Sequence, residues 1–157
     1  MHQTFLVRLP VALYIIAVPI EMIILELTVA VFITSVGAAP RNLHGAEHGT
    51  ATIYIATLLL APLFETVIAQ VIPYELLRRV GVTRRLFYVT AMTLIFMSIH
   101  LSAGLGTMMV AGLVGGMYLA NTYIIYRNKS FRVAYFVTAT CHAMNNVLFL
   151  IIAALAM

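Results

Sequence analysis

Four side chains that can carry out hydrolytic chemistry lie inside long apolar stretches of this sequence. Glu65, His100, His142 and Asn146 each stand ten or more residues from the nearest arginine. A titratable side chain at membrane depth costs about 2.5 kcal/mol or more on insertion scales, so it is usually paired and usually functional. A carboxylate and an imidazole can take a proton from water, and an amide can donate to a developing oxyanion. The four residues therefore predict a hydrolytic site inside a membrane.

The spacing of His142 and Asn146 places both on one face of a helix, because residues four apart are neighbours. Asn145 lies close by at a spacing of three, so either amide can accompany the imidazole. Together they can orient a water molecule or donate to an oxyanion. Hydrogen bonding between helices explains the same pair equally well, since polar residues commonly link membrane helices.

Glu65 follows Pro62, which loosens a helix at a place where water or a bent backbone is tolerated. A desolvated carboxyl beside a histidine such as His100 suits water activation. Both residues also have a structural interpretation, as a protonated carboxyl and a hydrogen-bonded core imidazole. Glu21 is a further mid-membrane carboxyl that lines the cavity, shares a proton with a site residue or makes a structural hydrogen bond. Glu26 is expected nearer the outer surface.

The composition places the chain in a membrane. Of its 157 residues, 63% are hydrophobic and only 9% are charged, whereas about a quarter of a soluble domain is charged. A transmembrane helix needs about 20 apolar residues. Five stretches qualify, namely 9–36, 50–77, 86–104, 107–126 and 132–155. The predicted fold is an all-α, polytopic bundle of about five spans, forming a single domain over residues 1–157.

Positive charge sets the predicted topology. Four arginines lie in the 78–85 loop and three bases in the 127–132 loop, whereas 101–106 has none. By the positive-inside rule the two basic loops are cytoplasmic, the N-terminus is inside and the C-terminus is outside. The bases therefore report orientation, and no nucleic-acid partner is expected. We expect an integral protein of a prokaryotic plasma membrane.

Helical rise places the four polar residues at one depth. At ~1.5 Å per residue, His142 lies about 15 Å from the cytoplasmic end of its helix, and Glu65, His100 and Asn146 lie about 20 to 21 Å from theirs. All four fall within one slab of a hydrocarbon core ~30 Å thick. Residues from three different helices can therefore meet in the interior of the bundle.

Two other features are expected to serve packing. Gly112 and Gly116 stand four apart in the fourth stretch, the spacing that lets membrane helices approach closely. Cys141 precedes His142, but adjacent helical residues point about 100° apart. We therefore expect Cys141 to be a core residue rather than a nucleophile.

The order of these residues resembles that of a known family. Residues 96–100 form a Phe-x-x-x-His motif and residues 142–146 form a His-x-x-x-Asn motif, with Glu65 on an earlier helix. This order resembles the CPBP family of intramembrane proteases, which includes CAAX prenyl proteases and bacteriocin-processing relatives. The resemblance covers about residues 58–150.

The first motif departs from the usual Glu-Glu-x-x-x-Arg of that family. Thr66 replaces the second glutamate and Gln70 replaces the arginine, while the first glutamate is kept as Glu65. This departure weakens the expectation of a prenylated substrate more than the expectation of catalysis, because the first glutamate is the one that is kept. The residues expected to line the site without a catalytic role are Thr66, Gln70, Asn145 and Glu21.

The resemblance implies hydrolysis of a peptide bond by a glutamic mechanism. Glu65, oriented by His100, would activate water, and His142 with Asn146 would hold the oxyanion. A glutamate and two histidines can also bind zinc and leave a position for water. The alternative is therefore a zinc site formed by Glu65, His100 and His142, although no cofactor is favoured. The expected partners are a membrane-anchored protein or peptide substrate and the lipid bilayer, with the oligomeric state unknown.

Two other classes of function remain open. A noncatalytic membrane scaffold or immunity protein would keep the same fold, and a proton-coupled transporter would use Glu21, Glu65 and the histidines as a relay. The absence of an internal repeat argues against the transporter. His44–His48 spells His-x-x-Glu-His, an inverted zinc-protease motif. It stands in a predicted loop with no evident third ligand.

Overall fold

The computed structural model describes residues 9–37 and 51–155, and every regular element in those ranges is helical. The His44–His48 motif and both chain ends lie outside them. The first span is α2 (Val11–Ser35), the third is α6 (Arg85–His100) continued by η4 (Leu101–Ala103), and the fifth is α9 (Phe131–Leu155). The second comprises α3 (Ala51–Ile55), η2 (Ala56–Leu60), α4 (Ala61–Thr66), η3 (Val67–Val71) and α5 (Ile72–Arg79). The fourth comprises α7 (Leu105–Thr107), η5 (Met108–Gly115) and α8 (Gly116–Arg127).

The predicted all-α class and the five spans are confirmed. In the described ranges, five helical segments are long and apolar enough to cross a membrane: Val11–Ser35, Ala56–Arg79, Arg85–Ala103, Leu105–Arg127 and Phe131–Leu155. Large apolar side chains on their outer faces, such as Val31 and Phe32, are exposed. Such exposure suits contact with lipid rather than water.

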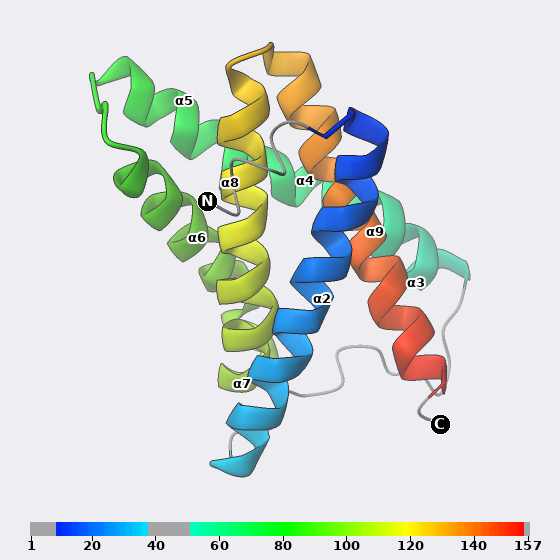
Figure 1. Cartoon of the computed structure of the whole chain (residues 1–157). Helices are drawn as coiled ribbons and strands as arrows, with labels where there is room; N and C mark the ends of the chain where they lie inside the picture. The colour runs from blue at the N-terminus through cyan, green and yellow to red at the C-terminus, as the bar shows by residue number, and fades with distance from the viewer. Residues whose placement is uncertain (1–8, 38–50, 156–157) are drawn as a thin grey trace.

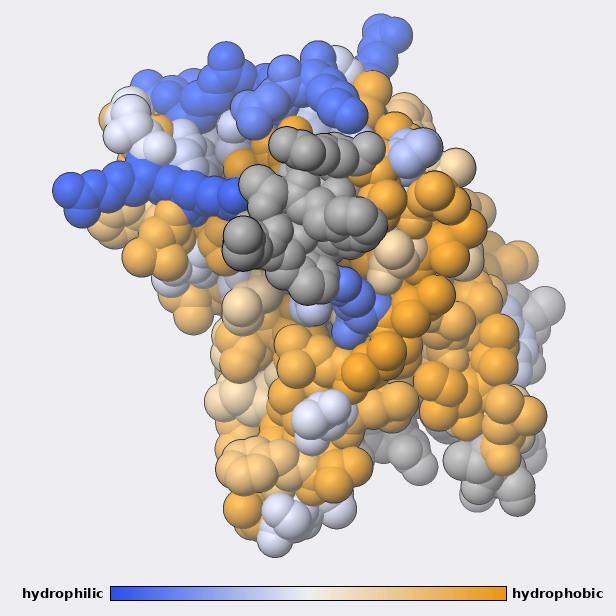
Figure 2. All heavy atoms as spheres, viewed as in Figure 1, coloured by the Kyte–Doolittle hydropathy of each residue, from blue (hydrophilic) through white to orange (hydrophobic). Residues whose placement is uncertain are grey.

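The polar residues gather at one end of the bundle. The turn from α5 to α6, the turn from α8 to α9 and the start of α2 all lie in the upper part of Figure 1. The end of α2, α7 and the end of α9 lie toward the bottom. Figure 2 shows hydrophilic residues along the top and an apolar surface over most of the remainder. The seven Lys and Arg residues of the two turns thus mark one rim of an apolar body.

The helices pack around the fourth span, which is the most buried of the five and contacts each of the other four. α9 contacts α2, α4, η2 and α8, while α6 contacts η5 and α8. The buried side chains between them are largely aromatic and aliphatic, including Tyr14, Phe96, Tyr123 and Tyr126. The spans that carry Glu65, His100 and His142 therefore surround a common interior.

Gly112 and Gly116 allow the third and fourth spans to approach closely, as the sequence predicts. A Cβ atom at Gly112 would lie 2.9 Å from the Met97 Cα, and one at Gly116 would lie 3.2 Å from the Thr93 Cα. The Cβ atom added at Gly112 would also lie 3.5 Å from the His100 Cβ. The glycine contact therefore helps to fix the depth and rotation of the helix that carries His100.

The turn between the third and fourth spans depends on Gly104. Its φ of 101° lies in the left-handed region that side-chain-bearing residues rarely adopt. The backbone N–H of Gly104 donates to the Leu101 carbonyl at 3.0 Å, closing the end of the third span. His100 therefore sits immediately before a tight reversal of the chain.

The second span contains two π-helical segments that flank the turn bearing Glu65. η2 precedes α4 and η3 follows it, with Pro62 at the start of α4. π segments widen a helix locally and occur frequently at functional sites. Because each one changes the rotation of the residues beyond it, the direction of the Glu65 side chain is set by these segments and not by a regular helical repeat.

Candidate active site

Glu65 and His142 come together in the interior of the bundle. The Nε2 atom of His142 lies 3.7 Å from Oε2 of Glu65, although the residues are 77 positions apart on α4 and α9. The side chain of His142 is 7% exposed and that of Glu65 is 22% exposed. At this separation the two atoms lie just beyond hydrogen-bond distance, so one water beside the pair can be reached by both. The structure therefore brings together two of the four candidate catalytic residues directly.

His100 is held next to this pair by its own helix. Its Nδ1 atom lies 2.9 Å from the Phe96 carbonyl oxygen, which can only accept, so Nδ1 carries the hydrogen. The Phe96 ring lies 4.7 Å from the His100 ring and 5.4 Å from the His142 ring, centroid to centroid. One phenylalanine thus packs against both imidazoles. In neutral His100 the Nε2 lone pair remains available to accept a proton.

The two neighbouring asparagines have different partners. Asn146 donates from Nδ2 to the Thr57 carbonyl oxygen in η2 at 2.8 Å. Asn145 is buried, and its Nδ2 lies 3.1 and 3.3 Å from the two carboxyl oxygens of Glu26. Asn146 therefore faces the second span, where Glu65 lies, whereas Asn145 faces the first span.

Thr66 and Gln70 lie in the interior of the bundle, and their polar atoms have no hydrogen-bond partner among the described residues. Both side chains are fully buried, and neither the Thr66 hydroxyl nor the Gln70 amide has a hydrogen bond to the described residues. Buried polar groups of this kind usually bind internal water. They follow Glu65 at one and five residues along the chain, toward the polar rim of the bundle.

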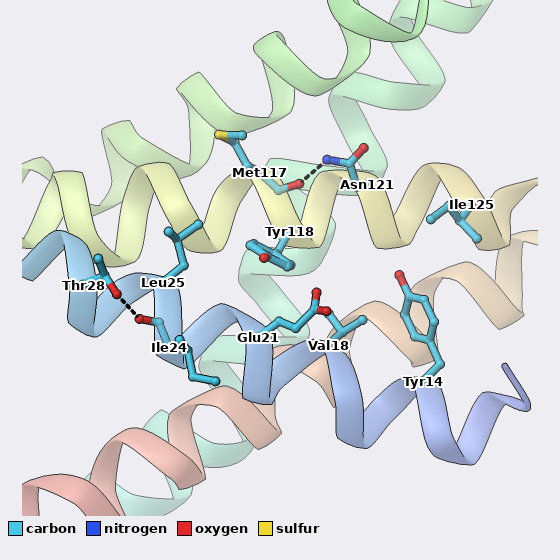
Figure 3. A pocket seen from close by; sticks show the side chains of 10 residues that line it. All are labelled: Tyr14, Val18, Glu21, Ile24, Leu25, Thr28, Met117, Tyr118, Asn121 and Ile125. Carbon is cyan, nitrogen blue, oxygen red and sulfur yellow. Dashed lines mark hydrogen bonds between the residues drawn. The ribbon is translucent and has the colours of Figure 1, made fainter. Parts of the chain in front are cut away.

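Glu21 lies apart from the other candidates. It lines a groove of about 580 Å³ between α2 and α8, and the four candidate catalytic residues are not among the residues of that lining. Figure 3 shows Glu21 on α2 and Tyr118 on α8 pointing into this groove from opposite sides. The lateral groove is thus separate from the interior that contains Glu65.

The sequence reasoning missed Glu26 as a component of the interior. Glu26 is only 2% exposed, a burial between the helices that the sequence analysis did not anticipate. Glu26 stands five residues after Glu21, which rotates it about 140° around a regular helix. The two carboxyls therefore face different neighbours. The only sequence signal was a second acidic residue inside the first apolar stretch.

The zinc alternative requires Glu65, His100 and His142 to converge on one ion. In the part of the chain that the structure describes, no three His, Cys, Asp or Glu side chains converge as a metal-ligand set. Whether Glu65, His100 and His142 bind zinc stays a question for metal analysis.

The fold and site define a polytopic membrane protein with a carboxyl and two imidazoles in its apolar interior. The family model described as "Type II CAAX prenyl endopeptidase Rce1-like" matches residues 47–148, most of the chain. The chain therefore belongs to the Rce1-like family of type II CAAX prenyl endopeptidases, in agreement with the resemblance seen in the sequence. Comparison with curated proteins and with solved structures gave no match.

Proposed function

We propose that this protein is an intramembrane endopeptidase that hydrolyses a peptide bond in a membrane-anchored protein or peptide. The observation that carries the proposal is the 3.7 Å approach of His142 Nε2 to Glu65 Oε2 in the apolar interior. A carboxyl is costly at this depth, and a carboxyl beside an imidazole is suited to taking a proton from water. Membership of a protease family supports the same conclusion.

The proposed first step is the activation of water. Glu65, assisted by His100, takes one proton from a water molecule, and the oxygen adds to the carbonyl carbon of the scissile peptide. His100 is suited to assist, because its Nδ1–H is bonded to the Phe96 carbonyl and its Nε2 lone pair is available. The product of this step is a tetrahedral intermediate with a negatively charged oxygen.

The proposed second step is the collapse of that intermediate. His142 and Asn146 hold the oxyanion by hydrogen bonds, which strengthen as the charge develops. Asn146 has a second Nδ2 hydrogen for this purpose, since the first is donated to the Thr57 carbonyl. The C–N bond then breaks, and the proton taken from water passes to the leaving amine. The products are a carboxyl end and an amine end.

The proposed substrate is a membrane-anchored segment cut near the outer face, and not a prenylated cytoplasmic tail. The positive-inside rule places the basic rim in the cytoplasm, so that Glu65 and His100 lie slightly past the midplane, about 20 Å from that rim. In addition, Thr66 and Gln70 replace the second glutamate and the arginine of the usual motif. The terminal anchor of an exported protein has the required chemistry and position.

The proposal is tested by sequencing the protein termini in membranes of host cells that lack the gene and carry either the wild-type protein or the Glu65→Gln variant. We expect wild-type membranes to contain new termini, within or beside apolar segments, that are absent with the variant at equal abundance. Identical sets of termini would overturn the proposal and favour a noncatalytic scaffold.

Metal dependence provides a further prediction. If Glu65 acts as a general base without a metal, the purified protein should contain less than stoichiometric zinc and keep its activity after strong chelation. Metal analysis and an activity assay on the same chelated sample measure this. Tight stoichiometric zinc that is lost in His100→Ala and His142→Ala would assign the protein to the zinc proteases, in which the ion acidifies the water.

A further inference from the structure

Glu26 is a buried carboxyl close to the candidate site. It projects from α2 between the fourth and fifth spans, is 2% exposed, and both its oxygens lie within 3.3 Å of the Asn145 Nδ2. A Cβ atom at Gly115 would lie only 3.4 Å from its Oε1, so this glycine leaves room for the carboxyl. Burying such a group in an apolar bundle is costly. Two neighbours nevertheless accommodate it: Asn145 donates a hydrogen bond to it, and Gly115 leaves space for it.

Asn145 connects Glu26 to the helix face that carries His142. Asn145 and His142 are three residues apart on α9 and therefore neighbours on one face. Because the Asn145 Nδ2 is bonded to Glu26, its Oδ1 is the end left for another partner. That Oδ1 is buried and has no hydrogen bond to any described residue, and the same is true of the His142 Nδ1.

These two unpartnered atoms are complementary in one protonation state of the ring. An amide oxygen can only accept, so it is satisfied if His142 carries its hydrogen on Nδ1. A direct hydrogen bond or one bridging water would satisfy both atoms in that state. In that tautomer the Nε2 lone pair of His142 faces the Glu65 carboxyl at 3.7 Å.

We infer that Glu26 and Asn145 are positioning residues that hold His142 in its Nδ1–H tautomer with Nε2 directed at Glu65. The hydrogen bond made by one ring nitrogen determines the protonation of the other. Glu26 fixes the orientation of the Asn145 amide, and Asn145 in turn fixes the ring. The catalytic consequence rests on the proposed function, whereas the tautomer itself does not.

The consequence for hydrolysis concerns the path of the proton. With Nδ1–H held, the Nε2 of His142 can receive the proton that Glu65 takes from water. The resulting imidazolium donates a hydrogen bond to the oxyanion, and it gives up the Nε2 proton to the leaving amine when the C–N bond breaks. A base oriented by a third group in this manner is a recurrent arrangement in hydrolytic sites.

The test is ¹⁵N NMR of histidine-labelled protein in bilayers, with His142 assigned by its loss in His142→Ala. We expect the Nδ1–H tautomer of His142 in the wild type and in Glu26→Gln, whose side-chain carbonyl still accepts from Asn145. We expect this preference to be lost in Glu26→Leu and in Asn145→Leu. Tyr14→Phe is the matched control, because Tyr14 is also on α2, is also 2% exposed and donates or accepts one buried interhelical bond, to Thr122.

The kinetic counterpart uses a cleaved substrate and the same variants. Loss of one hydrogen bond involving a charged group corresponds to about a tenfold to hundredfold fall in kcat, which we expect for Glu26→Leu with KM unchanged. We expect Glu26→Gln and Tyr14→Phe to retain kcat within about threefold, less than 0.7 kcal/mol.

An Nε2–H tautomer of His142 in the wild type would overturn the inference, whether or not any variant folds. An unchanged tautomer in folded Glu26→Leu would do the same. An inactive wild-type protein with His142 in the Nδ1–H form would contradict the proposed function. It would still support the inference that Glu26 and Asn145 set the tautomer of His142.

Discussion

We expect the Glu65→Gln variant to lose about 10²- to 10⁴-fold in kcat, the range typical of a removed general base. Glutamine has nearly the volume of glutamate, so the packing around α4 and the approach of His142 should be kept. The amide cannot take a proton from water, however, and the hydrolytic step loses its base. The measurement is the cleavage rate of a substrate identified from the new termini, with purified protein in lipid vesicles.

Glu75→Gln is the matched control for this substitution. Glu75 lies in the same span but at the polar rim, where its Oε1 is 2.5 Å from Arg127 Nε. The chemical change is identical, and we expect the cleavage rate to stay at the wild-type level. Normal cleavage by a folded, membrane-inserted Glu65→Gln protein would contradict the glutamic mechanism.

The common depth of the polar residues was predictable because it depends only on helical rise and on the positions of the arginines. Counting from the basic loops placed Glu65 and His142 in one slab, and the structure brings their side chains to 3.7 Å. The glycine contact was predictable for a similar reason, since the spacing of Gly112 and Gly116 alone puts both on one helix face. Both inferences depend only on the spacing of residues along one helix, so they can be made without knowing how the helices pack.

Rotation about the helix axes could not be predicted in this way. Asn145 and Asn146 were equivalent candidates in the sequence, and only packing decides that Asn146 faces Thr57 while Asn145 faces Glu26. The π segments beside Glu65 add to the difficulty, because they break the regular repeat on which facing arguments depend. The burial of Glu26 was missed for the same reason, since every side of α2 is apolar in sequence.

The partner of Glu75 shows the same limit on a smaller scale. Its spacing from Arg78 predicts an ion pair within one helix end, and a contact of 3.8 Å is present. The shorter contact is with Arg127 at the end of the fourth span. The sequence spacing thus identified a real ion pair, but the ion pair between different spans has the shorter distance.

The second large effect that we expect is the destabilisation of the bundle by Gly112→Val. A Cβ atom at this position would lie 2.9 Å from the Met97 Cα, and backbone cannot yield as a flexible side chain can. Overpacking of this kind typically costs about 1–3 kcal/mol. Because the same Cβ would be 3.5 Å from the His100 Cβ, the third span must shift with its imidazole. We therefore expect both a lower unfolding midpoint and a lower kcat.

Ala111→Val distinguishes this close contact from a general intolerance of bulk in η5. Ala111 precedes Gly112 in the same π segment, and its side chain is only half-buried. The added methyl groups should be accommodated there, with the unfolding midpoint and kcat close to those of the wild type. Unfolding measured in mixed micelles, with the cleavage rate of the same samples, gives both quantities. A Gly112→Val protein as stable and as active as Ala111→Val would show that the glycine contact does not position His100, and the depth of that residue would then depend on the Gly104 turn alone.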